Sequence, residues 1–517
     1  MVKRLLVFAF CAILLVSSSL HAEVAAGASS DSWLYLSMML KFAKAGGAKS
    51  PTPTKPPTQP TPTHTPTPTP RDPTYRVNAP YFNVENVLID RFSETAVFWF
   101  GKITPTENAM DVRVGYNDLA LFVRVAVYDR LFWYDPSPTP AEMVNWDSVS
   151  LYLNTNGSTG DAPGQQSFHF IGQLSKYETR DAFQAVSQGN QSGGWSPATL
   201  QFVTRSGWRG EGGFNTGKDN RGWTMSFLIP FEALGLSGKP ADGVTWGMAL
   251  EAYDRDDANG DSILVKTWPG TPDLNRPSSW GELRYGLITY TPPASTPGGA
   301  VDIRQEPGGA VVVDGAVGGG FQCGEGLEFW SEWGEYVDYL DPEDATKERT
   351  GFNVCNEADI ADWPCFSKYF TIFPLDTLPA GKVIRSATLT MYQFGSMGDV
   401  NDPNPDNRPK PTLIQILTID RDFDETTLNF NNAPLARENV AATWVAPTSF
   451  PGWPGIPYEW DITSAVAEAY RNGQPLRIAV YTADSNYHSG RYFSSSDANP
   501  DWNLAARPNL HIEWGNP

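Results

Sequence analysis

The chain has 517 residues, with 38 Lys and Arg against 58 Asp and Glu, so its formal net charge is 38 − 58 = −20. This balance argues against a nucleic-acid binder, because such proteins carry basic patches that displace counterions from phosphates. The length allows two or three domains. The 18 Trp, 20 Tyr, 46 Gly and 43 Pro are typical of turn-rich β domains with aromatic surfaces, not of helical bundles.

Residues 1–22 have the pattern of a bacterial secretory signal peptide. Two basic residues precede an apolar run from Leu5 to Val16, and small residues around Ala22 offer a cleavage point. The run is shorter than the roughly 20 residues that span a bilayer, and retention as an uncleaved anchor is the alternative. We expect an extracellular or cell-surface protein.

Residues 23–50 contain a short amphipathic helical pattern. Trp33, Leu36 and Leu40 fall on one face, and two glycines end the pattern. A helix of this length is marginal in water by itself. We expect residues 30–46 to dock on a partner, on a second copy of the chain or at a membrane surface.

Residues 51–74 form a Pro/Thr linker. Residues 51–70 contain nine Pro and eight Thr, and Pro both lacks a backbone donor and fixes φ. An extended chain at about 3.1 Å per residue would reach roughly 60 Å. We expect a stalk that holds the globular regions away from an anchor point; the alternative is a tail without a role.

From residue 75 to about 290, apolar residues alternate with polar ones in several short runs separated by Gly, Asn and Asp turns. This period of two predicts strands of a β-sandwich. The residues expected to point inward are Leu119, Leu121, Val123, Val125 and Val127; Val149, Leu151 and Leu153; Trp223, Met225, Phe227 and Ile229; and Trp246, Met248 and Leu250.

Five segments of this region, in chain order, resemble the family 9 carbohydrate-binding modules. They are residues 112–125, 146–149, 229–235, 254–256 and 277–283. The resemblance implies a jelly-roll-like sandwich, bound calcium, and a sugar held between aromatic side chains. The wider fold, the DOMON-like sandwich, also includes proteins that carry haem.

The sugar site is less similar to the family pattern, because Trp146 adjoins Asp147 directly and Ser150 stands where the family has an acid. Sugar rings stack on aromatic faces, and their hydroxyls need polar partners at the rim. Each Trp taken singly is also a common core residue. The candidate platforms are Trp146, Trp195 and Trp268, and the candidate polar partners are Asn145, His169 and Arg276.

The densest group of oxygen ligands lies between residues 254 and 261. Its carboxylates would repel one another without a cation, and Gly260 lets the backbone turn around a hard ion such as Ca²⁺. The segment lacks the distal Glu of an EF-hand loop. From residue counts alone a solvated acidic turn is an equal alternative, and the resemblance favours calcium. The candidate ligands are Asp254, Asp256, Asp257, Asn259 and Asp261.

Residues 291–300 are rich in Pro, Gly and Ser and predict a linker between two domains. Beyond it the alternation resumes, and one short helix is expected at residues 464–472, with Thr463 or Asp461 as its cap. The residues expected inside are Ala387, Leu389 and Met391; Leu476, Ile478 and Val480; and Leu510, Ile512 and Trp514.

Residues 301–517 resemble the DNRLRE domain, named after disaggregatase-related proteins. The similar segments are residues 369–381, 384–389, 460–463, 493–496 and 507–510. The resemblance implies a second jelly-roll sandwich on a secreted or surface protein, with carbohydrate binding in some relatives. Residues 318–365 depart from the pattern. Their acidic and aromatic composition, with Trp330, Trp333 and Trp363, predicts an insertion that carries specificity or contacts a neighbour.

Three cysteines follow the signal peptide: Cys323, Cys355 and Cys365. Cys355 and Cys365 could close a disulfide loop in an exported protein, and either could instead pair with Cys323.

No serine-hydrolase elbow, HExxH, P-loop or Rossmann fingerprint is present in the sequence. We therefore expect a non-catalytic polysaccharide-binding protein with two calcium-stabilised sandwich modules. One alternative is a structural subunit of an extracellular fibre, sheath or surface layer. Another is a polysaccharide-degrading enzyme, which needs only two carboxylates. A haem carrier using His169 with Met110, Met143 or Met248 is the remaining alternative.

Overall fold

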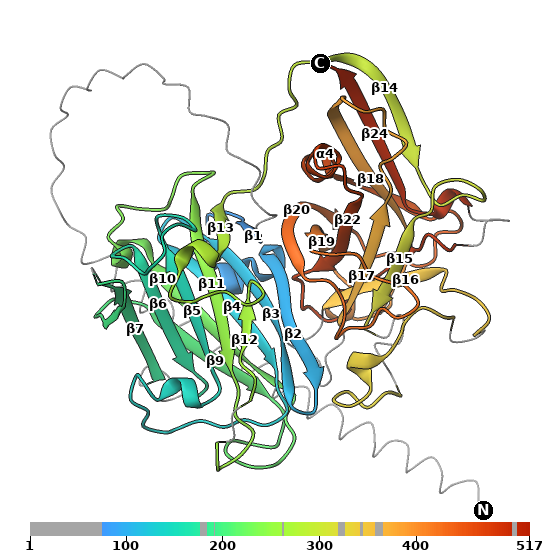
Figure 1. The fold of residues 1–517 in the computed structure, drawn as a ribbon. Coiled ribbons are helices and arrows are strands. Elements are labelled where there is room, and N and C mark those ends of the chain that lie inside the picture. The colour runs from blue at the N-terminus through green and yellow to red at the C-terminus, as the bar shows by residue number, and fades with distance from the viewer. Residues whose placement is uncertain are drawn as a thin grey trace, which may run out of the picture. The chain divides into compact units, whose positions relative to one another are not determined.

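The computed structural model describes residues 75–175, 183–190, 192–260, 263–318, 326–341, 345–356, 366–498 and 504–517. These residues are nearly all β structure (Figure 1), which confirms the expected all-β class. Residues 71–517 belong to one compact unit. The expected signal peptide, the helical segment 23–50 and the Pro/Thr linker lie outside the described residues. No helix in the described part of the chain is long and apolar enough to cross a membrane.

The first sandwich is formed by two sheets. One has five antiparallel strands in the order β2-β3-β4-β10-β9, and the facing sheet has the order β1-β13-β11-β5-β6-β7-β8, with β12 beside the end of β11. The bounds are β1 Arg76–Ala79, α3 Val87–Asp90, β2 Ala96–Thr104, β3 Glu107–Tyr116, β4 Ala120–Tyr128, β5 Ser148–Asn154, β6 Ser167–Gln173, β7 Gln184–Gly189, β8 Trp195–Pro197, β9 Val203–Arg209, β10 Gly222–Pro230, β11 Thr245–Tyr253, β12 Lys266–Trp268 and β13 Gly281–Tyr285.

The second sandwich also has two sheets. One runs β15-β17-β22-β19-β20, and the other runs β14-β24-β18-β21. β23 follows β24 along the same side of β18, and β16 pairs with β23. The bounds are β14 Thr296–Ile303, β15 Val313–Val317, β16 Gly351–Asn356, β17 Phe366–Phe373, β18 Val383–Ser396, β19 Thr412–Ile419, β20 Ala436–Val445, β21 Ile456–Asp461, α4 Thr463–Arg471, β22 Leu476–Thr482, β23 Arg491–Ser494 and β24 Asn509–Asn516.

The alternating residues lie in the cores as expected, with two exceptions. Leu119 is 60% exposed, because it occupies the turn before β4 and its backbone N–H is bound by the Asn117 side chain. Trp514 is only partly buried. The expected helix is confirmed as α4, which spans Thr463–Arg471. The expected cap is corrected: Ile462 is the N-cap and makes no side-chain cap bond, while the Thr463 N–H donates to Asp461 Oδ1 at 3.0 Å.

The sheet formed by β2, β3 and β4 is buried on both faces. Its inner face packs in the first sandwich, and its outer face packs against β17 and β22 of the second. Trp99 lies 6.1 Å from Phe370 and 5.6 Å from Tyr481, and Tyr128 stacks on Phe366 at 4.5 Å between ring centroids. A sheet covered on both sides needs continuous apolar runs instead of alternation. The β2 sequence Ala-Val-Phe-Trp-Phe has this character.

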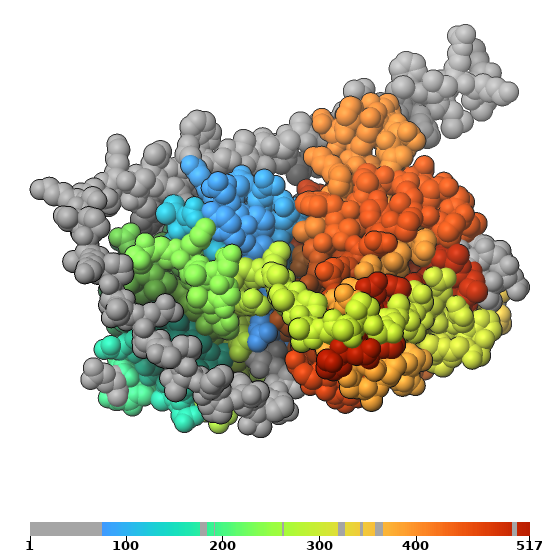
Figure 2. All heavy atoms as spheres, turned by 90° about the horizontal axis from the view of Figure 1, so that it is seen from above, coloured from blue at the N-terminus to red at the C-terminus, as the bar shows by residue number. Residues whose placement is uncertain are grey.

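A second contact joins the two sandwiches at their sheet edges. β1 pairs with β13 and also forms a parallel bridge between Arg76 and Glu438 of β20. The Arg76 guanidinium completes the link with ion pairs to Glu282 at 2.6 Å and to Glu438 at 3.2 Å. In Figure 2 the blue N-terminal strands lie against the orange part of the second sandwich.

Two connecting segments differ from expectation. Residues 296–303 form β14, which pairs with β24, so the linker expected at 291–300 ends inside a strand.

In the expected insertion 318–365, Trp330 and Trp333 are 2% exposed. Trp333 packs against Phe366 and Phe430, so these two rings belong to the core between the sandwiches. Trp363 lies outside the described residues.

Trp268, expected as a sugar platform, is a core residue. It is 1% exposed and packs 4.5 Å from Phe98 and 6.4 Å from Tyr75. A buried ring offers no face to a polysaccharide, so the expectation is wrong for this residue.

We predict that Trp268→Ala lowers the free energy of unfolding by about 3–5 kcal/mol, because it removes buried apolar surface and leaves a cavity. Urea denaturation followed by circular dichroism measures the change. The control is Trp444→Ala, whose ring is 47% exposed and whose loss should change stability by about 0.5 kcal/mol or less. Equal effects of the two variants would contradict the core assignment.

Candidate functional site

Four rings gather on the face of the β5-β6-β11 sheet that points away from the first core; we call them the aromatic cluster. Tyr152 of β5 and His169 of β6 are directly opposite each other and stack with centroids 4.3 Å apart and planes 3° apart. Trp195 opens β8 and lies 5.8 Å from Tyr152 and 5.9 Å from His169. Trp280 follows the 277–279 turn, 5.7 Å from Tyr152. The alternation that sends Leu151 inward puts these side chains on the opposite face.

The two Trp rings of the cluster are parallel, with centroids 6.5 Å apart and planes 3° apart. A sugar between two rings needs carbon contacts of about 3.5–4 Å on each side, or about 7–8 Å in total. The space between these rings therefore does not admit a sugar. Tyr152 and Trp280 are buried, while Trp195 and His169 are half-buried, so a ligand would meet the open parts of Trp195 and His169.

Polar groups lie beside the rings on the same sheet face. The hydroxyls of Tyr152 and Tyr253 both donate to Glu251 Oε2, the first at 3.1 Å, and Ser150 Oγ bonds His169 Nε2 at 2.8 Å. Burial raises the pKa of Glu251 above its usual range. Burial also lowers the pKa of His169 to about 4, so the imidazole is neutral at pH 7. The cluster therefore presents a neutral imidazole and several hydroxyl groups.

The structure divides the other expected sugar-binding residues among separate places. Trp146 is half-buried under the Arg255 guanidinium, 3.9 Å from its ring centroid, and the Asn145 carbonyl accepts from Arg255 at 3.4 Å. Arg276 is exposed, next to Asn275, whose Oδ1 accepts the Trp195 indole N–H at 3.0 Å. Of the six expected residues, Trp195 and His169 meet in the cluster. Tyr152, Trp280 and Glu251 were missed; alternation places Tyr152 and Glu251 on this face.

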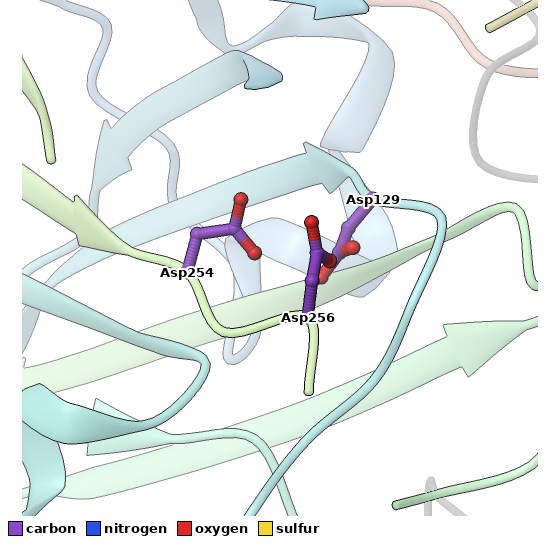
Figure 3. Close-up of side chains that lie close together, drawn as sticks. All are labelled: Asp129, Asp254 and Asp256. Carbon is purple, nitrogen blue, oxygen red and sulfur yellow. The ribbon is translucent and has the colours of Figure 1, made fainter. Parts of the chain in front are cut away.

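Three carboxylates converge at one end of the first sandwich. Asp129 follows β4, Asp254 follows β11, and Asp256 lies two residues further along (Figure 3); one oxygen of each lies within 4.8 Å of the others. Asp147 is buried close by, and its oxygens accept the backbone N–H groups of Trp133 at 2.7 Å and Arg255 at 2.9 Å. We call Asp129, Asp254 and Asp256 the acidic cluster.

Burial and mutual repulsion make the charged forms of the carboxylates in the acidic cluster unfavourable. Burial, together with the neighbouring carboxylates, raises the pKa of Asp254 to about 8 and that of Asp256 to about 6. The pKa values of Asp129 and Asp147 are raised for the same two reasons. Asp254 Oδ1 is buried without a hydrogen-bond partner. An unpaired buried oxygen among like charges is the environment that a bound cation relieves.

The donor set fits a hard cation. Every candidate ligand is a carboxylate oxygen, and two oxygens each about 2.4 Å from one Ca²⁺ lie at most about 4.8 Å apart. A bound Ca²⁺ would offset two of the three negative charges and tie the segment after β4 to the segment after β11.

Sequence reasoning identified only part of this set. Asp257 Oδ1 instead accepts the N–H groups of Asn259 and Gly260, both at 2.7 Å, which stabilises the turn at Gly260, where φ is 73°. Asp257 is not among the three converging carboxylates, and Asn259 is exposed at the same turn; their role as ligands stays a prediction. Asp261 lies outside the described residues. Asp129 was missed, although the same tripeptide Tyr-Asp-Arg ends β4 and β11.

The second sandwich carries an exposed group of rings that sequence reasoning also missed; we call it the loop patch. Phe450 is 58% exposed and Trp453 is 45% exposed, and both lie in the loop between β20 and β21. Phe450 contacts Trp453 at 5.4 Å, and Trp453 lies 6.1 Å from Phe394 of β18. Phe394 stacks on Tyr492 of β23 at 6.1 Å. Exposed contiguous rings of this kind mark interaction surfaces.

A groove of about 900 Å³ lies at neither ring surface. Its walls are residues 374–384 and α4 with the turn after it, and the segment around Tyr290 covers one side.

Comparison with known proteins gives fold-level likenesses only. No family model matches the chain, and no curated protein matches it. Among solved structures, a family 9 carbohydrate-binding module from Caldicellulosiruptor kristjanssonii in complex with cellotriose is 17% identical. It has a TM-score of 0.30 and covers 42% of this chain and 100% of its own. The same module with glucose has a TM-score of 0.29.

A putative carbohydrate-binding protein from Bacteroides uniformis is 11% identical, with a TM-score of 0.29, and covers 41% of this chain and 99% of its own. At these identities and TM-scores the likenesses assign neither a ligand nor a site to this chain.

Cys355 is buried in β16. Cys323 and Cys365 lie outside the described residues, so the disulfide alternatives stay predictions.

We predict that chelator-treated protein loses stability as pH rises from about 4 towards 8. A raised folded-state pKa means that the folded protein holds protons that the unfolded chain has released above its ordinary value near 3.8. Stability is therefore greatest below that value and falls as pH rises through about 6 and then about 8. Melting temperatures measured from pH 4 to 8 with EDTA test this.

In the same series, added Ca²⁺ should raise the melting temperature at pH 8 more than at pH 4. Asp129→Asn should reduce the increase, and Asp273→Asn, an exposed carboxylate outside the cluster, should leave it unchanged. A calcium response that is equal at both pH values would contradict the assignment.

Proposed function

We propose that this protein is a secreted or surface-held, non-catalytic polysaccharide-binding protein that uses ring faces on both sandwiches. The observation that carries the proposal is the aromatic cluster, where half-buried Trp195 and His169 lie beside hydroxyl and carboxyl groups. Sugar rings present C–H faces that stack on aromatic rings, and their hydroxyls bond to such rim groups. The loop patch offers a second stacking surface with Trp453 and Phe450.

The negative charge of the chain favours neutral polysaccharides over acidic ones as ligands. A formal charge of −20 repels polymers that carry carboxylates or sulfates, and the neutral state of His169 provides no compensating cation. We expect neutral polysaccharides to bind more tightly than acidic ones.

Calcium has a structural role in this proposal. An ion held by Asp129, Asp254 and Asp256 would order the loops that follow β4 and β11, and β11 also carries Glu251, which bonds Tyr152 of the aromatic cluster. Secretion by residues 1–22 and display on the Pro/Thr linker 51–74 complete the proposal, with residues 30–46 as a contact to a second copy or another partner.

We predict that the full chain is retarded in native gels containing a neutral soluble glycan. Trp195→Ala and Trp453→Ala should each weaken binding about tenfold, equivalent to about 1.4 kcal/mol, because each removes one stacking face. Matched controls are Trp208→Ala, 38% exposed on β9, and Trp444→Ala, 47% exposed on β20; both should bind as the wild type does.

Three outcomes would overturn the proposal. Absence of retardation by a panel of neutral and acidic glycans, with fibres formed by the full chain in electron micrographs, would favour the structural subunit. New reducing ends after incubation with a polysaccharide would favour an enzyme. Equal losses in the ring variants and their controls would exclude these two surfaces.

A further inference from the structure

A lysine side chain is fully buried where the two sandwiches meet. Lys368 of β17 is 0% exposed, and its Nζ lies over three rings, 4.3 Å from the centroid of Phe430, 4.5 Å from Tyr481 and 4.8 Å from Trp99. Lysine is almost never fully buried unless it is paired.

The nearest carboxyl group belongs to the other sandwich. Asp111 of β3 is 1% exposed, and its Oδ1 lies 3.9 Å from Lys368 Nζ. That separation exceeds the 2.7–2.9 Å of a charged hydrogen bond. Both Lys368 Nζ and Asp111 Oδ1 are buried without a hydrogen-bond partner. A non-covalent pair held in this way leaves a large desolvation cost uncompensated.

The two oxygens of Asp111 are in different environments. Oδ2 accepts the Tyr481 hydroxyl at 2.6 Å and the Asn356 amide at 3.0 Å, whereas Oδ1 faces the lysine. Two donors on one oxygen polarise that C–O bond and are placed to stabilise negative charge on it. The other oxygen is then the leaving group.

Burial moves the amine towards the neutral state that attack requires. Burial lowers the pKa of Lys368 to about 8; the Asp111 carboxylate opposes this shift and nearby Arg113 adds to it. The reaction needs the ammonium to pass one proton to Asp111 Oδ1 first, a step that replaces two buried charges with a neutral pair.

We propose that Lys368 and Asp111 form an intramolecular isopeptide bond that joins the two sandwiches covalently. The neutral amine attacks Asp111 Cγ, and the negative charge develops on Oδ2, which Tyr481 and Asn356 hold. The C–Oδ1 bond breaks, Oδ1 takes the amine proton, and one water leaves. Amine plus acid give amide plus water, with no oxidant or reductant. The fixed contact between the two groups replaces an external catalyst.

The bond would link β3 directly to β17, across an interface that is otherwise held by packing and ion pairs. The inference does not depend on the proposed polysaccharide function.

The test is a tryptic map of the full-length wild-type protein by tandem mass spectrometry. The expected product is peptide 103–113 joined to peptide 350–382, with no cleavage after Lys368 and a mass about 18 Da below the sum of the two peptides. Lys368→Arg keeps the cation but should yield separate peptides. Asp111→Asn should lose ammonia instead, about 17 Da.

Separate, unmodified peptides 103–113 and 350–368 from the wild type would overturn the proposal, whatever the variants do. A loss of about 17 Da confined to peptide 350–382 would also overturn it, because the amide would then join Lys368 to Asn356.

Discussion

The burial of one sheet on both of its faces is the constraint on which this structure depends. This sheet contains β2, β3 and β4. One face packs inside the first sandwich, and the other packs against β17 and β22 of the second. Trp99 contacts Phe370 and Tyr481 across that boundary. Neither half of the contact is a normal solvent-facing surface, since each would expose large rings if separated. The two β modules therefore share apolar surface, instead of being independent units on a flexible tether.

The same boundary contains polar groups whose arrangement packing alone does not explain. Lys368, Asp111 and Asn356 lie among aromatic rings, where each uncompensated polar atom is costly. The acidic cluster also contains buried charged groups, at one end of the first sandwich. In both places, buried charged groups lack sufficient hydrogen-bond partners, which is why we propose a covalent bond at the boundary and a bound cation at the acidic cluster.

The two ring surfaces have different character. The aromatic cluster is a sheet-face site, in which Tyr152 and His169 are fixed by cross-strand stacking and Trp195 is held by its bond to Asn275. The loop patch is more open and lies on a connection between strands, where binding residues are often found. A rigid surface and an exposed one on the same protein suit attachment to a long polymer, because two weak contacts add through effective concentration.

The amino-acid sequence by itself determined the β class, the inward residues of most strands and the position of α4, because these follow from local periodicity and from neighbours a few residues apart. It also placed Asp254 and Asp256 in a dense group of carboxylate side chains. Only the tertiary structure decided that Trp268 is buried, that Asp257 bonds its own turn and that Asp129 joins the acidic cluster. It also decided that Lys368 meets Asp111, 257 positions apart in the sequence. Such outcomes depend on which strands pack across from one another, and alternation along a single strand does not carry that information.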